Sequence, residues 1–199
     1  MNDPKKLSAI ILCLIVVGLG FYLIPAGTDK FDKNAVAPDF VPQYSLINQD
    51  GEPVSEKTYA DTYQLVYFGF TFCPEICPTE LQKMTVALNE LEPSVLEKIQ
   101  PIFITVDPAR DTPEVMKEYL KSFHPRFVGF TGTEDTVDVA IDGFKIYAAK
   151  VDDPSLSDYT INHSSYIYLI APSGDLIALY KKEDSANDIA QGIRQAVGQ

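Results

Sequence analysis

The sequence predicts an α/β domain in which helices flank a mixed β-sheet. Two continuous apolar runs, 63–70 and 101–106, have the composition of strands buried on both faces. Each run is followed by a segment with apolar residues at helical spacing. A C-terminal hairpin pattern then precedes a last helical segment. This order of elements is expected for one sheet with helices on its faces.

The first half of the domain begins near Phe40 with a predicted hairpin over 44–54. Its turn is placed at Asn48–Gly51, because Asp-Gly tolerates the positive φ that tight hairpin turns require. After the first apolar run, Pro78 suits the first position of a helix, which places Cys77 at about the N-cap. The apolar face of this helix consists of Leu81, Met84, Leu88 and Leu91.

The second half of the domain continues with a helix capped by Thr112, with Pro113 at its first position. Strands at 126–130 and 144–151 are predicted on either side of a short helix over 136–141. The remaining predicted features are a hairpin over 165–182 that turns at Ser173 and Gly174, and a capping box of Ser185 and Asp188 that opens the last helix.

The composition restricts the possible functions. A chain of 199 residues suits one domain with an appendage, and 46% hydrophobic with 22% charged residues is ordinary for a globular protein. The formal net charge of -12 argues against a nucleic-acid partner, because phosphates require a basic surface. The sequence also lacks a glycine-rich nucleotide loop after a strand.

The N-terminal residues 7–24 carry no charge and predict a transmembrane helix. Such a helix is about 27 Å long, close to the roughly 30 Å thickness of the hydrocarbon core. Lys5 and Lys6 precede it, so the positive-inside rule places residues 1–6 in the cytoplasm and the rest on the outer side. A cleaved signal peptide is the alternative, although no clear cleavage site follows the apolar run.

Residues 25–39 have the mixed composition of a linker, which leaves 40–199 as the folded domain. Cys13 lies within the apolar segment and is interpreted as a membrane-facing residue, because Leu12 precedes it where a lipoprotein acceptor requires a small residue. The chemistry is therefore expected from Cys73 and Cys77, in a compartment where disulfides persist.

Cys73 and Cys77 occupy a predicted loop at a helix N-terminus, within "FGFTFCPEICPTEL". The partial positive charge there lowers the pKa of a thiol and favours the thiolate, which attacks disulfides and binds metals. A structural disulfide is one interpretation, but such a short loop yields only about 2 kcal/mol. Metal binding and thiol redox chemistry are the other two interpretations. Metal binding requires both sulfurs to reach one ion, and redox chemistry requires them to reach each other.

Two adjacent thiolates form a soft chelate for Cu(I) or Zn(II) that needs a further ligand. Structural zinc sites usually have four ligands, and no second Cys or His cluster is present, so three ligands suit Cu(I) better. His163 precedes a buried strand and is a candidate ligand or a hydrogen-bonded loop histidine. His124 is expected to be non-functional at a helix end. Asp107 is predicted either to assist a metal site or to cap a turn.

Three segments, "FGFTFCPEICPTEL", "ITVDPARDTPEVMKEYL" and "TINHSSYIYLIAPSGDLIALY", occur in this order. From about Phe40 to the C-terminus the chain resembles the Sco/SenC family of membrane-anchored copper proteins that assist assembly of cytochrome c oxidase. The resemblance implies a thioredoxin-like fold and one copper ion, Cu(I) or Cu(II), bound by Cys73, Cys77 and His163. Asp107 is a matching acidic residue with a less defined role. Asn162 departs from the family, in which Asp often precedes this histidine.

The resemblance implies a copper metallochaperone for the Cu-A site of cytochrome c oxidase subunit II, loaded by an upstream copper donor. The domain would lie on the periplasmic or equivalent side of an inner (cytoplasmic) membrane. The alternative is a thiol-disulfide oxidoreductase in which Cys73 and Cys77 are catalytic and keep the Cu-A ligand cysteines reduced. A third hypothesis is a non-catalytic binding module with a structural disulfide, which predicts that removing both thiols lowers only stability.

Overall fold

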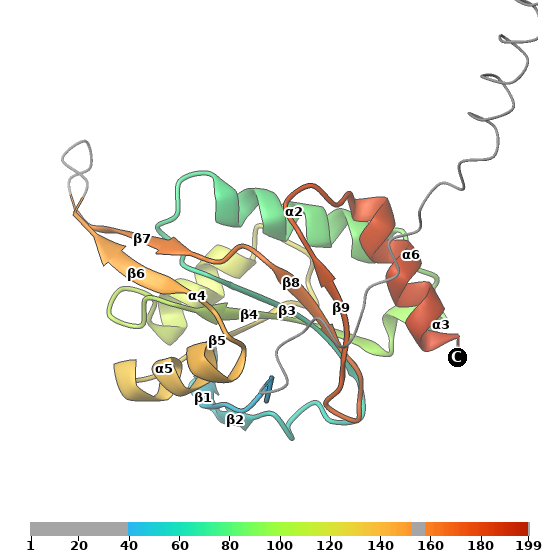
Figure 1. Cartoon of the computed structure of the whole chain (residues 1–199), viewed down its shortest axis with the longest axis horizontal. Coiled ribbons are helices and arrows are strands. Elements are labelled where there is room, and N and C mark those ends of the chain that lie inside the picture. The colour runs from blue at the N-terminus through green and yellow to red at the C-terminus, as the bar shows by residue number, and fades with distance from the viewer. Residues whose placement is uncertain (1–39, 153–157, 199) are drawn as a thin grey trace, which may run out of the picture. The chain divides into compact units, whose positions relative to one another are not determined.

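The computed structural model describes residues 40–152 and 158–198 (Figure 1). The predicted cytoplasmic N-terminus 1–6, the anchor 7–24 with Cys13, and the linker 25–39 lie outside these residues. In the described part of the chain, every helix is too short or too polar to cross a bilayer.

The main element of the fold is a seven-stranded mixed sheet with the strand order β2-β1-β5-β4-β3-β8-β9. Its three central neighbours β3, β4 and β5 are parallel, and the remaining pairs are antiparallel. The strands are β1 (Ser45–Asn48), β2 (Pro53–Ser55), β3 (Tyr63–Gly69), β4 (Ile99–Thr105), β5 (Val128–Thr131), β8 (Ile167–Ile170) and β9 (Leu176–Tyr180). Separately, β6 (Ala148–Val151) and β7 (Thr160–His163) form a two-stranded antiparallel sheet.

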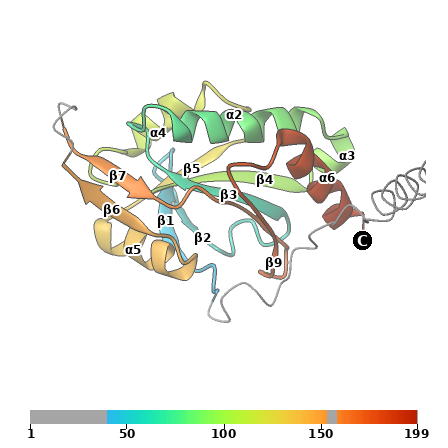
Figure 2. The same ribbon diagram turned by 45° about the horizontal axis from the view of Figure 1, so that its top comes forward.

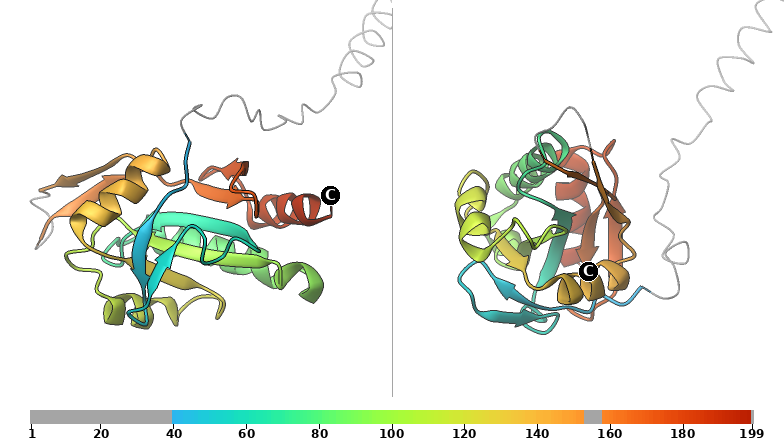
Figure 3. Two further views of the ribbon diagram at one scale, coloured as in Figure 1. Left: turned by 90° about the horizontal axis from the view of Figure 1, so that it is seen from below. Right: turned by 90° about the vertical axis from the view of Figure 1, so that its left-hand side faces the viewer.

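Helices cover both faces of the main sheet, as predicted (Figures 2 and 3). The helices are α2 (Ile76–Asn89), α3 (Pro93–Leu96), α4 (Pro113–Leu120), α5 (Glu134–Gly143) and α6 (Ala186–Val197). Helix α2 packs beside α6, and Tyr119 of α4 contacts Phe103 on this face. On the opposite face, the ring of Phe144 at the end of α5 lies 4.9 Å from that of Phe68.

Several local predictions are confirmed. The first hairpin turns at Asp50-Gly51, where Gly51 has φ +81°, and the last hairpin turns at Gly174 with φ +86°. Thr112 caps α4 by accepting a hydrogen bond from the Val115 backbone. Ser185 and Asp188 form the predicted capping box of α6. Side-chain chemistry at these positions therefore determines where the elements begin.

One local prediction was wrong, and one was incomplete. Helix α2 begins at Ile76 with Glu75 as the N-cap, so Cys77 lies in its first turn and not at the cap. Pro78 is accommodated there because the first four N–H groups of a helix have no intrahelical partner. His163 precedes the buried strand β8 (Ile167–Ile170), as predicted, and it is also the last residue of β7, a strand that was not predicted.

One edge of the sheet collects the segments that carry the candidate ligands. In the parallel pair β3–β4, Gly69 is opposite Thr105, so the chain leaves both strands at the same edge. In the antiparallel pair β3–β8, Tyr67 is opposite Ile167, which brings the residues that precede β8 to this edge as well. The cysteine loop, the segment after β4 and the end of β7 therefore meet.

Candidate metal centre

The structure brings Cys73, Cys77 and His163 together. Their two sulfur atoms and one ring nitrogen all lie within 4.8 Å of one another, and Cys77 Sγ is 3.3 Å from His163 Nε2. Both cysteines are free thiols. Two soft sulfur donors and one imidazole nitrogen are a ligand set that suits Cu(I).

The cysteine loop places its two sulfurs in different surroundings. Cys73 is partly exposed, whereas Cys77 is fully buried beneath it in the first turn of α2. The Cys77 backbone N–H donates to Cys73 Sγ at 3.4 Å. The sulfur of Cys73 thus occupies the anion-binding position at a helix N-terminus.

Asp111 fixes the start of this loop, and sequence reasoning did not identify it. Its carboxylate is fully buried and accepts hydrogen bonds from the Thr71 backbone at 3.0 Å and from the Thr71 hydroxyl at 2.5 Å. Thr105 at the end of β4 donates a third bond at 2.6 Å. Burial raises the pKa of Asp111, although these three bonds oppose the shift. Asp111 therefore ties the segment after β3 to the end of β4.

The imidazole of His163 has a defined orientation. Its Nδ1 lies 2.9 Å from the Ser164 carbonyl oxygen, which can only accept, so Nδ1 carries the proton. In the neutral imidazole, Nε2 is then the nitrogen with the free lone pair, and it faces Cys77 Sγ. The rings of Phe70 and Tyr67 meet the imidazole edge to face at 5.8 and 6.3 Å. The ring is therefore held with a lone pair directed at the thiols.

The two thiols have opposite pKa shifts. The pKa of Cys73 is lowered because Cys77 donates a hydrogen bond to its sulfur, and His163 and backbone N–H groups add to this effect against the cost of burial. The pKa of Cys77 is raised by the same interaction with Cys73 and by burial. The metal-free pair therefore holds one proton, mainly on Cys77, and Cys73 is the thiolate.

We expect iodoacetamide to alkylate Cys73 about tenfold faster than Cys77 at pH 7. An unperturbed thiol is only a few per cent thiolate at this pH, whereas the lowered pKa keeps Cys73 ionised. The rate at Cys73 should stay nearly constant between pH 8 and pH 6, while that of an ordinary thiol falls with its thiolate fraction. Peptide mapping by mass spectrometry measures both rates, and preferential modification of Cys77 would contradict this assignment.

Asp107 lies outside this cluster of ligand atoms, and its carboxylate has other partners. It accepts from the Tyr159 hydroxyl at 2.7 Å and from Arg110 Nε at 2.5 Å, and it is fully buried. His124 is a structural residue: its backbone donates to the hydroxyl of Thr85 in α2 at 3.1 Å, and its Nδ1 accepts from the Arg126 backbone at 3.2 Å.

The surroundings of Cys77 fit an anionic sulfur bound to a cation. The Tyr67 ring is fully buried beside Cys77, and its hydroxyl has no partner with regular hydrogen-bond geometry in the described residues. Burial and the neighbouring sulfur raise the pKa of Tyr67, so its hydroxyl stays a neutral donor. A buried donor beside Cys77 suits a thiolate ligand better than it suits a thiol.

A family model described as SCO1/SenC matches residues 32–198. The chain belongs to the SCO1/SenC family. The SCO2-like protein of Rickettsia typhi is 40% identical over 205 residues, which cover 97% of this chain and 98% of that protein. The structure of Arabidopsis thaliana ScoI with copper bound has a TM-score of 0.74 and 34% identity, covering 80% of this chain and 99% of that chain. Copper-bound yeast Sco1 has a TM-score of 0.74 and 35% identity, covering 81% and 90%.

Membership of the SCO1/SenC family confirms the resemblance noted in the sequence. It also confirms a thioredoxin-like mixed α/β fold, because these Sco structures match over most of the chain. The Sco family comprises cytochrome c oxidase assembly proteins. In this Sco chain, the three residues implied by the resemblance are the ones that converge at one edge of the sheet.

Proposed function

We propose that this Sco protein is a copper metallochaperone that binds one copper ion through Cys73, Cys77 and His163 and serves cytochrome c oxidase assembly. The observation that carries the proposal is the convergence of these three donor atoms within 4.8 Å. The copper-bound relatives support it. The bound ion is the cargo, so the site must hold it and also release it.

The geometry of the site supports both binding and release. One sulfur and the imidazole approach each other at 3.3 Å, and Cys73 lies partly exposed at the rim. The exposed sulfur is the ligand that an acceptor can reach first in a stepwise ligand exchange. Copper binding displaces the proton held mainly by Cys77, so affinity is expected to fall as the pH falls.

An anaerobic Cu(I) titration against a competing chelator tests the ligand set. His163→Ala is expected to lower Cu(I) affinity by at least about 100-fold, because even the loss of a residue that only orients a ligand costs 10–100-fold. His124→Ala is the matched control, since His124 bonds to Thr85 and Arg126 and is not one of the three donors. A Cys13→Ser background removes the third thiol from the titration. Equal affinity of the parent and His163→Ala would contradict the proposal.

A thiol-disulfide oxidoreductase is the second candidate function. It is favoured by the asymmetry of the pair, in which Cys73 is partly exposed with a lowered pKa while Cys77 is buried with a raised pKa. In that reaction the Cys73 thiolate attacks a partner disulfide, and Cys77 then resolves the mixed disulfide. The same pair would keep the Cu-A ligand cysteines reduced. This activity does not need His163, so the His163→Ala variant separates the two functions.

The proposed partners are cytochrome c oxidase subunit II as acceptor and an upstream copper donor. The uncharged segment 7–24 supports anchoring in the inner membrane, with the copper-binding domain on the periplasmic or equivalent side. This arrangement would hold the domain near a membrane-bound oxidase.

A further inference from the structure

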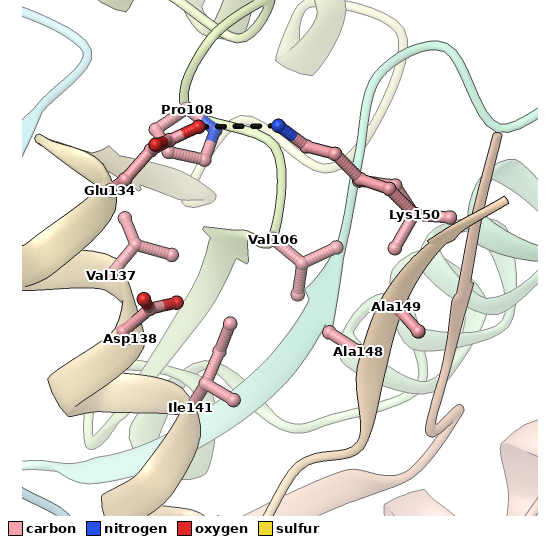
Figure 4. Close-up of a pocket in the computed structure, with 10 residues that line it drawn as sticks. Val106, Pro108, Glu134, Val137, Asp138, Ile141, Ala148, Ala149 and Lys150 are labelled. Carbon is pink, nitrogen blue, oxygen red and sulfur yellow. Dashed lines mark hydrogen bonds and ion pairs between the residues drawn. The ribbon is translucent and has the colours of Figure 1, made fainter. Parts of the chain in front are cut away.

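The β6–β7 hairpin carries His163 but is weakly packed against the rest of the domain. It is not part of the seven-stranded sheet, and among the residues of its two strands only Ile161 is buried. A cavity of about 260 Å³ separates β6 from α5 (Figure 4). An exposed ion pair between Lys150 and Glu134, at 3.2 Å, spans this cavity. Other contacts must therefore fix the position of the hairpin.

Arg110 supplies such contacts at Tyr159, the residue directly before β7. Its guanidinium lies 3.8 Å from the centre of the Tyr159 ring, and its Nη1 donates to the Tyr159 carbonyl at 3.0 Å. Its Nε donates to Asp107, which also accepts from the Tyr159 hydroxyl at 2.7 Å. Ring, hydroxyl and backbone of Tyr159 are thus all held by one Asp–Arg pair, in which Asp107 is fully buried and Arg110 is partly buried.

The same guanidinium also contacts the cysteine loop. It lies 4.9 Å from the centre of the Phe72 ring and 5.8 Å from that of Phe70. Phe72 directly precedes Cys73, and the Phe70 ring packs against the imidazole of His163. Arg110 therefore contacts both the cysteine loop and the residue that leads into the strand of His163. None of these contacts is to one of the three ligand atoms.

We infer that Arg110, held by Asp107, is a positioning residue that keeps His163 against the cysteine loop by clamping Tyr159. Tyr159 is four residues before His163, about 13 Å along an extended strand. Fixing the residue directly before so short a strand sets the direction in which the last residue of the strand points. The inference rests on the proposed function, in which His163 is a copper ligand. It gives Asp107 a role through Arg110 and Tyr159 and not as a ligand.

The test is a double-mutant cycle in the full-length chain, with Cu(I) alone as the probe. Arg110→Gln is expected to lower Cu(I) affinity about 10–100-fold in the parent, the usual effect of losing a residue that orients a ligand. In the His163→Ala background the same substitution should change affinity by less than about twofold, because the residue that it positions is absent. Equal losses in both backgrounds, or none in the parent, would overturn the inference.

Two further variants keep the test decisive. Glu134→Gln breaks the exposed ion pair that holds the same hairpin and should leave Cu(I) affinity unchanged within about twofold. Arg110→Lys retains the charge beside Asp107 but loses the planar fork and the ring stacking, so it should weaken binding even if Arg110→Gln does not fold. Wild-type affinity in Arg110→Lys would show that charge alone suffices and would overturn the clamp.

Hydrogen exchange of the metal-free chain separates failure of the clamp from failure of the proposed function. In Arg110→Gln the amides of β6 and β7 should exchange at least about tenfold faster, while those of β3 and β4 are unchanged. If His163→Ala leaves copper affinity unaltered, the ligand set is wrong, and this measurement alone decides whether Arg110 holds the hairpin. Unchanged exchange in β6 and β7 would overturn the clamp.

Discussion

Replacing Cys77 by serine is expected to lower Cu(I) affinity by at least about a thousandfold, or about 4 kcal/mol. Cys77 is the buried ligand whose sulfur faces His163 Nε2 at 3.3 Å. A hydroxyl at this position is a hard donor that does not replace a soft thiolate for Cu(I). The buried hydroxyl should also lower the free energy of unfolding by about 1–3 kcal/mol. Chelator competition and denaturant unfolding measure the two effects.

Cys73→Ser is the comparison that assigns the stability effect to burial. It also removes one of the two thiolates, so we expect a similar loss of copper affinity. Cys73 is partly exposed, and its replacement should change the free energy of unfolding by less than about 0.5 kcal/mol. If one of the two serine variants retained tight Cu(I) binding, a dithiol chelate would be excluded as the core of the site.

The sequence was sufficient to predict the elements that side-chain chemistry defines locally. Strands β3 and β4 were predicted because, apart from Gln64 and Gln100, their residues form nearly continuous apolar or β-branched runs, as burial on both faces requires. Strand β7 (Thr160–His163) was not predicted, because Ile161 is its only buried residue and the segment therefore shows no apolar run. The strand is defined by its pairing with β6. Its existence depends on a pairing that local pattern does not reveal.

In the candidate site, too, the features defined locally in the sequence were predicted, and those that depend on long-range contacts were not. The spacing of Cys73 and Cys77 and the position of His163 before β8 indicated the three donors. The residues that orient them gave no such signal: Asp111 bonds to Thr71 across 40 positions, and Arg110 reaches the Tyr159 carbonyl across 49. Their roles arise only because the segments after β3 and after β4 leave the sheet at the same edge and meet the start of β7 there.

Gly69→Ala is expected to damage the metal centre from within the sheet. A Cβ at Gly69 would lie 2.8 Å from Cys77 Sγ, 3.0 Å from the Phe103 ring and 3.1 Å from the Tyr67 ring. The 2.8 Å contact is closer than real Cβ atoms come, whereas each ring contact is relieved by a few tenths of an ångström, so the sulfur is the group that must move most. We expect Cu(I) affinity to fall at least about tenfold and the free energy of unfolding to fall by about 1–3 kcal/mol, as for other overpacked cores.

Gly174→Ala is the matched control, because it destabilises the fold for a different reason and far from the sulfurs. Gly174 has φ +86° with open space around it, so a Cβ there strains the backbone by about 1–2 kcal/mol without a steric contact. Its copper affinity should equal that of the parent. A loss of affinity in Gly69→Ala alone would show that the end of β3 carries glycine to make room for the Cys77 sulfur. Equal affinities in both variants would show that the sulfur adjusts without cost to binding.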